Sequence, residues 1–359
     1  MGQLSTLRDG HCDDFVTRCL NLSVMIISSP FESQLGRIPV RELSSVVLGT
    51  TTRSWDYGDA DAATTIVMVH GFRGDHHGLE PVVAQLGVPG RFDGTGATGG
   101  IRMISPDLPG FGQSDPLHGI RHDIEGYARW LRTFVAGLAL TGRVVILGHS
   151  FGSIVVAAAL AEPALADTAL TEPSLAANPA AGNSTDKALH PDAVILVNPI
   201  AAPALRGPRG ILTRLAVFYY WLSAVLPERL GFALLRNRVI VRVMSVTMAK
   251  TTDKGLRRWI HNQHDRYFSS FSDRRVVLEA FRASVGNDVS EFAARIPERT
   301  LLVAAEKDDI TPVAAQEKLV ALFPDAALHV IPAVGHLIHY EVPAQAAEQI
   351  VRFLERSAR

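Results

Sequence analysis

One stretch of sequence decides the fold: Val144-Val-Ile-Leu-Gly-His-Ser-Phe-Gly-Ser153. Its first four residues are apolar and include β-branched side chains, which predicts a buried strand of a parallel sheet. The apolar residues 154–161 predict a buried helix directly after it. A Gly-x-Ser-x-Gly motif between a strand and a helix is typical of a nucleophile elbow, a tight turn that presents the serine hydroxyl at the tip of the sheet. Ser150 is therefore the candidate nucleophile, and the alternative is an ordinary Gly/Ser loop.

Strands and helices alternate on both sides of this stretch. Segments 38–48 and 50–57 have the alternating pattern of an antiparallel strand pair, and later strands are short continuous apolar runs. The predicted later strands are 65–70, 101–105, 144–147, 193–197, 299–305 and 327–331, and the predicted helices are 77–86, 123–140, 154–161 and 344–354. Such an alternation predicts an α/β fold with a mostly parallel eight-stranded sheet and helices on both faces.

The alternation also divides the chain. Residues 1–36 form an N-terminal extension, with one helix expected around 13–22, and the α/β core comprises residues 37–198 and 293–359. Between them, residues 199–292 contain helical pieces without strands, which predicts an inserted helical cap. The apolar run 215–226 in this cap either lines a substrate pocket or packs on the core. Two further segments, the glycine-rich 87–100 and the Ala- and Pro-rich 162–191, are predicted loops.

Composition narrows the function further. The 359 residues are 47% hydrophobic and 20% charged with a net charge of -1, which gives no reason to expect a nucleic-acid partner. The two cysteines, Cys12 and Cys19, lack metal-type companions and are expected to be free thiols in a reducing compartment. No secretory signal and no apolar run of membrane-spanning length is evident. We therefore expect a cytoplasmic location, no integral membrane association, no metal and no cofactor.

The partners that a nucleophilic serine needs follow later in the chain. A serine hydroxyl is a weak nucleophile until an imidazole takes its proton, and a carboxylate must hold that imidazole in the correct tautomer. The strand predicted at 299–305 leads into a loop with Asp308 and Asp309. The last predicted strand leads into a loop with His336 and His339. Acid and base therefore both follow strands at the expected edge of a parallel sheet.

Five ordered motifs resemble those of the α/β-hydrolase superfamily, in its cap-bearing branch of serine hydrolases and esterases. The resemblance covers roughly residues 40–200 and 293–359. The motifs are His-Gly-Phe at 70–72, Asp-Leu-Pro-Gly-Phe-Gly-Gln-Ser at 107–114, Gly-His-Ser-Phe-Gly at 148–152, Glu-Lys-Asp-Asp-Ile-Thr-Pro at 306–312 and Gly-His-Leu-Ile-His-Tyr-Glu-Val-Pro at 335–343. In the family these are the oxyanion loop, the turn after the fourth strand, the elbow, the acid loop and the histidine loop.

The resemblance implies a role for individual residues. The family's acid stands four residues before the proline, which favours Asp308 over Asp309, and its catalytic histidine follows the glycine, which favours His336 over His339. The backbone N–H groups of Phe72 and Phe151 would form the oxyanion hole. Some relatives carry an alternative acid at the position of Asn198. Because an amide cannot supply that charge, Asn198 is expected to order the site or the following turn.

The expected activity follows from these roles. Ser150 would attack a carboxylic ester, or a related acyl bond, of a small molecule with an apolar acyl group. Serine in place of aspartate at the elbow argues against the epoxide hydrolases and dehalogenases of this fold. The alternatives are a carbon–carbon bond hydrolase, a haloperoxidase-like enzyme or an acyltransferase, which use the same triad. An alternative of another class is a ligand-binding protein of the same fold without catalysis.

Overall fold

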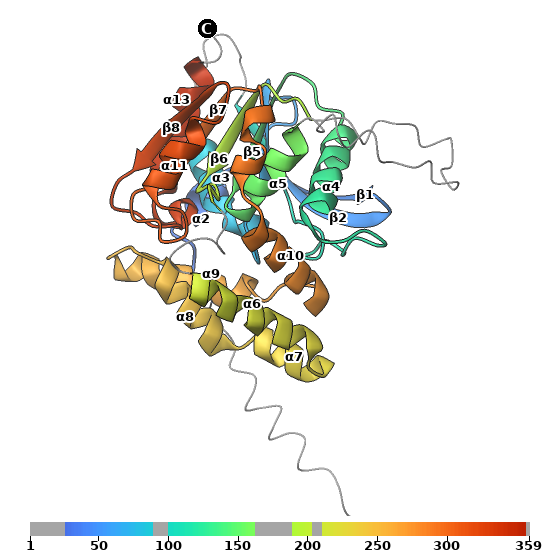
Figure 1. Ribbon diagram of the computed structural model, residues 1–359. Helices are drawn as coiled ribbons and strands as arrows, with labels where there is room; N and C mark the ends of the chain where they lie inside the picture. Colours follow the sequence, from blue (N-terminus) through green and yellow to red (C-terminus); the bar gives the residue numbers. More distant parts are fainter. Residues whose placement is uncertain (1–25, 89–99, 162–188, 203–209, 357–359) are drawn as a thin grey trace, which may run out of the picture.

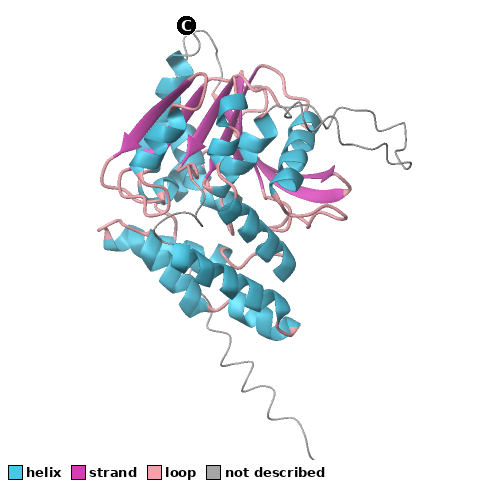
Figure 2. Ribbon diagram, in the orientation of Figure 1, coloured by secondary structure: helices cyan, strands magenta, loops and turns pink. Residues whose placement is uncertain are grey.

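A computed structural model describes residues 26–88, 100–161, 189–202 and 210–356. The helix expected at 13–22, both cysteines and most of the two predicted loops (89–99 and 162–188) lie outside these residues. The described chain forms one eight-stranded sheet covered by helices on both faces (Figures 1 and 2). The fold class predicted from the sequence is thus confirmed.

The strand order in the sheet is β1-β2-β4-β3-β5-β6-β7-β8. The strands are β1 (Val40–Val47), β2 (Thr50–Tyr57), β3 (Thr64–Val69), β4 (Ile101–Pro106), β5 (Arg143–His149), β6 (Ala193–Val197), β7 (Thr300–Ala305) and β8 (Ala326–Ile331). β1 and β2 pair in antiparallel fashion, β2 also runs antiparallel to β4, and every other pairing is parallel. The carboxyl ends of the parallel strands therefore meet at one edge, where ligand sites of such sheets form.

Successive side chains of each central strand enter two different cores, because a strand alternates its side chains between its faces. In β3, Val67 and Val69 pack with the helices α4 (Ile124–Gly137) and α5 (Phe151–Leu160). Ile66 and Met68 pack instead with α3 (Glu80–Leu86) and α13 (Pro343–Arg356). Burial on both faces explains why these strands are continuous apolar runs in the sequence.

Five helices stand between β6 and β7, where the sequence predicts the cap. They are α6 (Gly210–Val225), α7 (Glu228–Leu235), α8 (Arg238–Met248), α9 (Lys254–Tyr267) and α10 (Arg274–Gly286). Figure 1 shows them across the end of the sheet at which the parallel strands terminate. The side chains of Asn237, Asp253 and Asp273 accept backbone N–H groups at the starts of α8, α9 and α10, which ends each preceding loop at a defined residue.

The remaining elements are short or connect these layers. They are α2 (Glu32–Leu35), the 3-10 turns η1 (His76–Gly78), η4 (Val289–Glu291) and η5 (Ala293–Arg295), and the helices α11 (Val313–Val320) and α12 (Ile338–Glu341). The described end of the N-terminal segment packs on α9, because the N–H of Ile27 donates to Asn262 Oδ1 over 3.2 Å and the ring of Phe31 contacts that of Trp259. None of the helices in these residues is long and apolar enough to span a membrane.

Candidate active site

Ser150 occupies a strained turn between β5 and α5. Its backbone has φ 52° and ψ -119°, a conformation that costs energy for any residue but glycine. The turn is held because the N–H of Ser150 donates to the carbonyl of Val197 over 3.0 Å. A Cβ on Gly148 would lie 2.6 Å from the carbonyl oxygen of Gly152, and one on Gly152 would lie 2.3 Å from that of Val69. Both glycines of the motif are therefore required by close backbone approach.

The structure brings Ser150 together with two residues from the second half of the chain. His336 Nε2 lies 2.8 Å from Ser150 Oγ, and His336 Nδ1 lies 2.8 Å from Asp308 Oδ2. Because the carboxylate can only accept, Nδ1 carries a proton and Nε2 is the nitrogen that can take the proton of the serine. The arrangement can activate a serine hydroxyl.

Asp308 receives hydrogen bonds on both carboxylate oxygens. Oδ1 accepts the N–H groups of Ile310 (2.7 Å) and Thr311 (3.1 Å), and Oδ2 accepts from Asn198 Nδ2 (3.1 Å) as well as from His336. Burial raises the pKa of this carboxyl group, but the facing His336 and these hydrogen bonds outweigh it, so the pKa of Asp308 lies below its usual value. Asn198 thus contacts the acid directly.

The alternatives from the sequence have other surroundings. Asp309 is exposed and pairs with Lys250 Nζ over 2.6 Å, on the loop between α8 and α9. His339 is buried, and its ring lies tilted against that of His149, with ring centroids 4.0 Å apart. Neither residue is part of the hydrogen-bonded series that joins Ser150, His336 and Asp308.

The loop after β3 approaches the same serine. A Cβ on Gly71 would lie 3.3 Å from the Cβ of Ser150, so the backbone at 71 and 72 is within reach of a group bound to its hydroxyl. The N–H of Phe72 donates to no acceptor in the described part of the chain. Phe151 begins α5, where a helix leaves its first N–H groups without an intrahelical acceptor. The two N–H groups predicted for the oxyanion hole therefore lie on the two backbone segments that flank Ser150.

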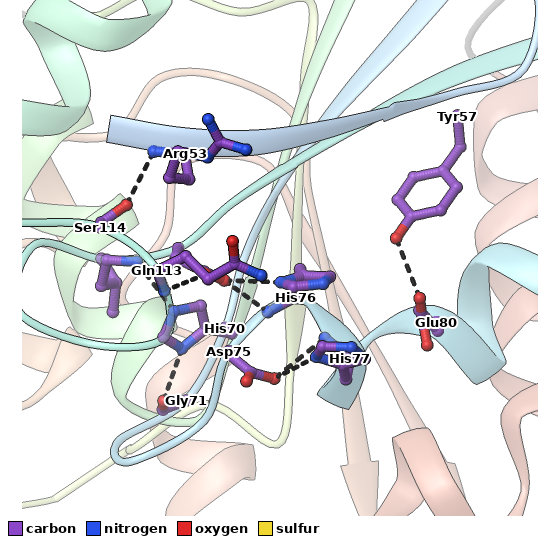
Figure 3. A network of polar contacts seen from close by, with 12 residues as sticks. Arg53, Tyr57, His70, Gly71, Asp75, His76, His77, Glu80, Gln113 and Ser114 are labelled. Carbon is purple, nitrogen blue, oxygen red and sulfur yellow. Dashed lines mark hydrogen bonds and ion pairs between the residues drawn. The ribbon is translucent and has the colours of Figure 1, made fainter. Parts of the chain in front are cut away.

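A network of buried polar side chains holds the loop after β3 in place (Figure 3). His70 Nε2 accepts the N–H of Leu108 over 2.9 Å, so its Nδ1 carries the proton and donates to the carbonyl of Gly71. Asp107, which the sequence places in a turn, accepts from Gln113 and also from the N–H and Nδ1 of His76, at distances of 2.8–2.9 Å. The turn after β4 and the loop after β3 are thus joined by hydrogen bonds.

Arg73 carries no motif signal and is not among the residues predicted for the site. Its side chain is buried, and it extends from the loop after β3 into the inserted helices. Nε donates to the carbonyl of Phe268 (2.8 Å), Nη2 to that of Leu235 (2.9 Å) and Nη1 to the hydroxyl of Tyr220 (3.4 Å). Arg73 therefore ties the candidate oxyanion loop to α6, to the end of α7 and to the end of α9.

A cavity of about 240 Å³ opens beside Ser150 and His336. Its lining is largely apolar: Leu79, Ile200, Met244, Met248, Phe268, Phe281, Val285, Ile310 and Leu337. Arg73, Asp75 and several histidines also line it. The inserted helices contribute from α8 to α10, and none of the described side chains of α6 lines the cavity. Of the two alternatives for residues 215–226, the structure favours packing for the buried side of the run, because Tyr220 belongs to the same apolar cluster as α4 and α5 and its ring centroid lies 4.1 Å from that of Phe281.

Three further histidines surround the cavity and are kept neutral. Burial, and then the neighbouring His336, lowers the pKa of His149 to about 3. Burial, and then His261, lowers the pKa of His264 to about 3, and burial with its histidine neighbours lowers that of His339 well below its usual value. At neutral pH these rings add no charge to the cavity, which suits an uncharged ligand.

Asp75, His76 and His77 offer metal-type ligand atoms within 4.8 Å of one another, and no other such group occurs among the described residues. Each already has a protein partner, because His77 donates to Asp75 and His76 donates to Asp107. Burial alone would lower the pKa of His77, but the bond to Asp75 outweighs it and the pKa is raised. These hydrogen bonds belong to the polar network that supports the loop after β3.

Comparison with known proteins gives one family and many structures. A model of the Alpha/beta hydrolase family matches residues 66–349. No curated protein matches at a significant level. Similar solved structures include an esterase from Thermogutta terrifontis (19% identity, TM-score 0.61, 89% of this chain and 100% of the other) and an esterase from Exiguobacterium antarcticum (17%, 0.62, 88% and 99%). A bromoperoxidase from Bacillus anthracis is equally similar (14%, 0.62, 88% and 99%), so the likeness shows the fold.

Proposed function

The chain belongs to the Alpha/beta hydrolase family, and we propose that within it the protein is a serine hydrolase that cleaves a carboxylic ester through an acyl-enzyme on Ser150. One observation carries the proposal: a continuous chain of hydrogen bonds runs from Ser150 through His336 to Asp308 at the wall of an apolar cavity. A structural role alone does not require a serine hydroxyl in a strained turn to face an imidazole that a buried carboxylate orients.

In the proposed mechanism, Ser150 Oγ attacks the ester carbonyl while its proton passes to His336 Nε2. The carbonyl oxygen becomes an oxyanion that accepts from the N–H groups of Phe72 and Phe151, donors worth about 2.7–4 kcal/mol each in such sites. His336 then gives the proton to the leaving alcohol, and the acyl-enzyme remains. A water molecule loses a proton to His336 and attacks the acyl group. His336 then returns that proton to Ser150 Oγ as the bond to the serine breaks and the acid is released.

The cavity supports an uncharged, apolar acyl group as the part of the substrate that is recognised. Methionine side chains of α8, phenylalanine side chains of α10 and of the residue after α9, and the neutral histidines line the cavity together. We include in the proposal that the predicted cap, residues 199–292, acts as the unit that shapes this cavity. The expected cytoplasmic location and the independence of metals and cofactors belong to the same proposal.

A fluorophosphonate probe tests the nucleophile. We expect it to label the folded protein and to leave Ser150→Ala unlabelled, whereas Ser28→Ala, at an exposed position, keeps full labelling. Labelling that persists in Ser150→Ala would contradict the assignment. Absence of labelling in the folded wild-type protein would favour a ligand-binding protein without catalysis.

A panel of p-nitrophenyl esters of graded acyl length tests the substrate class. The cavity of about 240 Å³ predicts hydrolysis of short to medium acyl chains and a decline once the chain exceeds the cavity. A protein that is labelled by the fluorophosphonate but hydrolyses no ester of the panel would favour a carbon–carbon bond hydrolase, a haloperoxidase-like enzyme or an acyltransferase.

A further inference from the structure

Most of the large apolar side chains that are exposed in the described chain lie on three consecutive helices. We call this set the outer apolar surface; it consists of Leu215, Phe218, Trp221 and Val225 on α6, Leu230 on α7, and Val239, Val243 and Val246 on α8. Scattered exposed apolar residues are ordinary on a protein surface, whereas a concentration on neighbouring elements marks an interaction site.

On α6 the exposed row faces away from the element on which the helix packs. Residues spaced by three or four positions share one face of a helix, as Leu215, Phe218 and Trp221 do. The opposite face is buried: Ser223 accepts a hydrogen bond on its carbonyl from Arg274 of α10, and Tyr220 contacts Phe281.

On α8 the arrangement is the same. Val239, Val243 and Val246 form one exposed row, whereas Ser245 is buried against His264 of α9, 2.6 Å from its Nδ1. Met244 on the inner side lines the cavity next to Ser150. Figure 1 shows α6, α7 and α8 in the helical layer beyond the edge of the sheet. One helix thickness, about 10 Å, therefore separates the exposed row from the cavity.

The same three helices are strongly basic. Residues 210–248 contain five arginines (214, 229, 236, 238 and 242) and one acidic residue, Glu228, although the whole chain has a net charge of -1. All five arginines are exposed on the same helices as the apolar rows or at the ends of those helices. Arg242 also pairs with Asp265, and the guanidinium of Arg236 lies over the rings of Phe232 and Phe271. Apolar and aromatic side chains bordered by arginine are the composition of helices that lie in the interface of an anionic bilayer.

We propose that the outer apolar surface docks on an anionic lipid surface, with its apolar side chains in the acyl boundary and its arginines at the headgroups. The charge pattern favours this occupant over a second copy of the chain, because two such surfaces face to face would bring their arginines together. The docking goes beyond the proposed function and does not require it. If both hold, the lipid surface also delivers apolar esters next to the cavity.

The tryptophans provide a direct reporter. Of the four in the chain, Trp221 is 42% exposed, whereas Trp55, Trp130 and Trp259 are at most 6% exposed. The experiment mixes the full chain with vesicles of phosphatidylcholine containing phosphatidylglycerol, and with phosphatidylcholine alone, and records tryptophan emission and cosedimentation. We expect a blue shift and cosedimentation with the anionic vesicles, both weakened by salt. Trp221→Phe should lose the shift and still cosediment.

Two double variants are compared with the wild type. Phe218→Ser/Val243→Ser removes apolar contacts from two helices and should lower the vesicle partition coefficient by about tenfold or more. Val46→Ser/Leu322→Ser changes two exposed apolar residues elsewhere on the molecule and should leave partitioning unchanged. Circular dichroism verifies that both variants remain folded.

Three results would overturn the proposal: no cosedimentation with anionic vesicles at low salt, equal loss in both double variants, or a lipid-free dimer whose Trp221 emission is already blue-shifted and insensitive to vesicles. The last would assign the surface to a second copy. Ser150→Ala separates this test from that of the proposed function, because it should bind vesicles like the wild type. Vesicle binding by a chain without esterase activity would leave docking in place and reject the esterase.

Discussion

Asp308 and Asp309 are neighbours in the sequence with opposite surroundings in the fold. Asp308 is buried and accepts hydrogen bonds from His336, Asn198 and two backbone N–H groups, whereas Asp309 pairs with a partly exposed lysine. The spacing to Pro312 favours the first of them. The fold supplies the physical difference, since only Asp308 can hold the tautomer of His336.

Exchange of each aspartate for asparagine measures that difference. Asp308→Asn should lower kcat for the ester found in the panel by about 10⁴-fold, because an amide favours the wrong imidazole tautomer. Asp309→Asn, the matched control, should change kcat by less than about threefold. Equal losses of kcat in the two variants, or a larger loss in Asp309→Asn, would show that the assignment of Asp308 as the acid is wrong.

A second prediction at this scale concerns the glycines of the elbow. In Gly152→Ala the new Cβ meets the carbonyl oxygens of Val69 and His70 at 2.3 and 2.6 Å, so strand and helix must separate, at a cost of about 1–3 kcal/mol or more. Gly137→Ala is the control, since nothing lies within 4 Å of its Cβ, and it should stabilise α4 by up to about 1 kcal/mol. Chemical denaturation of both variants tests the opposite signs.

At the scale of elements, the loop after β3 is held between the sheet and the inserted helices. His70 bonds it to the turn after β4, and Arg73 bonds it to carbonyl groups at the ends of α7 and α9. A shift of the inserted helices is therefore coupled to the backbone of Phe72, one of the two candidate oxyanion donors.

Arg73→Met tests this coupling. The variant keeps much of the side-chain volume but leaves the carbonyls of Phe268 and Leu235 without their donor, so it should lose about 2 kcal/mol of stability or more. It should also lower kcat/KM, with the greater part of the effect on kcat. Arg282→Met, an exposed position on α10, should change neither. Loss of stability with unchanged kcat would show that Arg73 has no part in positioning Phe72.

Sequence reasoning predicts what is local and misses what packing decides. The central strands are predictable because strands buried on both faces are continuous apolar runs, and the first two because their residues alternate along an antiparallel pair. The candidate triad is predictable because each member lies in a contiguous motif. For residues 215–226 the sequence leaves open whether the run lines a pocket or packs on the core. An apolar helix indicates that one of its faces is buried, but it does not indicate which element buries that face. The role of Arg73 cannot be predicted, because nothing in the sequence distinguishes a buried arginine from an exposed one. Its hydrogen-bond partners lie 147–195 residues away along the chain.

At the scale of the whole molecule, buried neutral histidines make stability depend on pH. The pKa values of His149 and His264 are about 3 in the folded chain against about 6.5 when unfolded. Between these values the unfolded chain binds more protons, so the free energy of unfolding is highest above about pH 6.5 and falls as the pH decreases towards 3.

The variant His264→Gln should reduce that dependence. It removes one proton of difference between the two states, which lowers the slope of unfolding free energy between pH 4 and 6 by up to about 1.4 kcal/mol per pH unit. Urea denaturation across this range measures the slope, with His118→Gln at an exposed position as the control. An unchanged slope in His264→Gln would mean that His264 is already protonated in the folded chain over this range.

The position of the inserted helices has a consequence for synthesis. β6 and β7 are neighbours in the sheet, yet β6 ends at Val197 and β7 begins at Thr300. A ribosome that adds about 5–20 residues per second needs about 5–20 seconds to pass from one strand to the other. Through that interval the nascent sheet has an open edge at β6, where another chain can pair. Ser150 is translated well before Asp308 and His336, so its hydroxyl can meet the imidazole of His336 only once residues 300–336 have emerged.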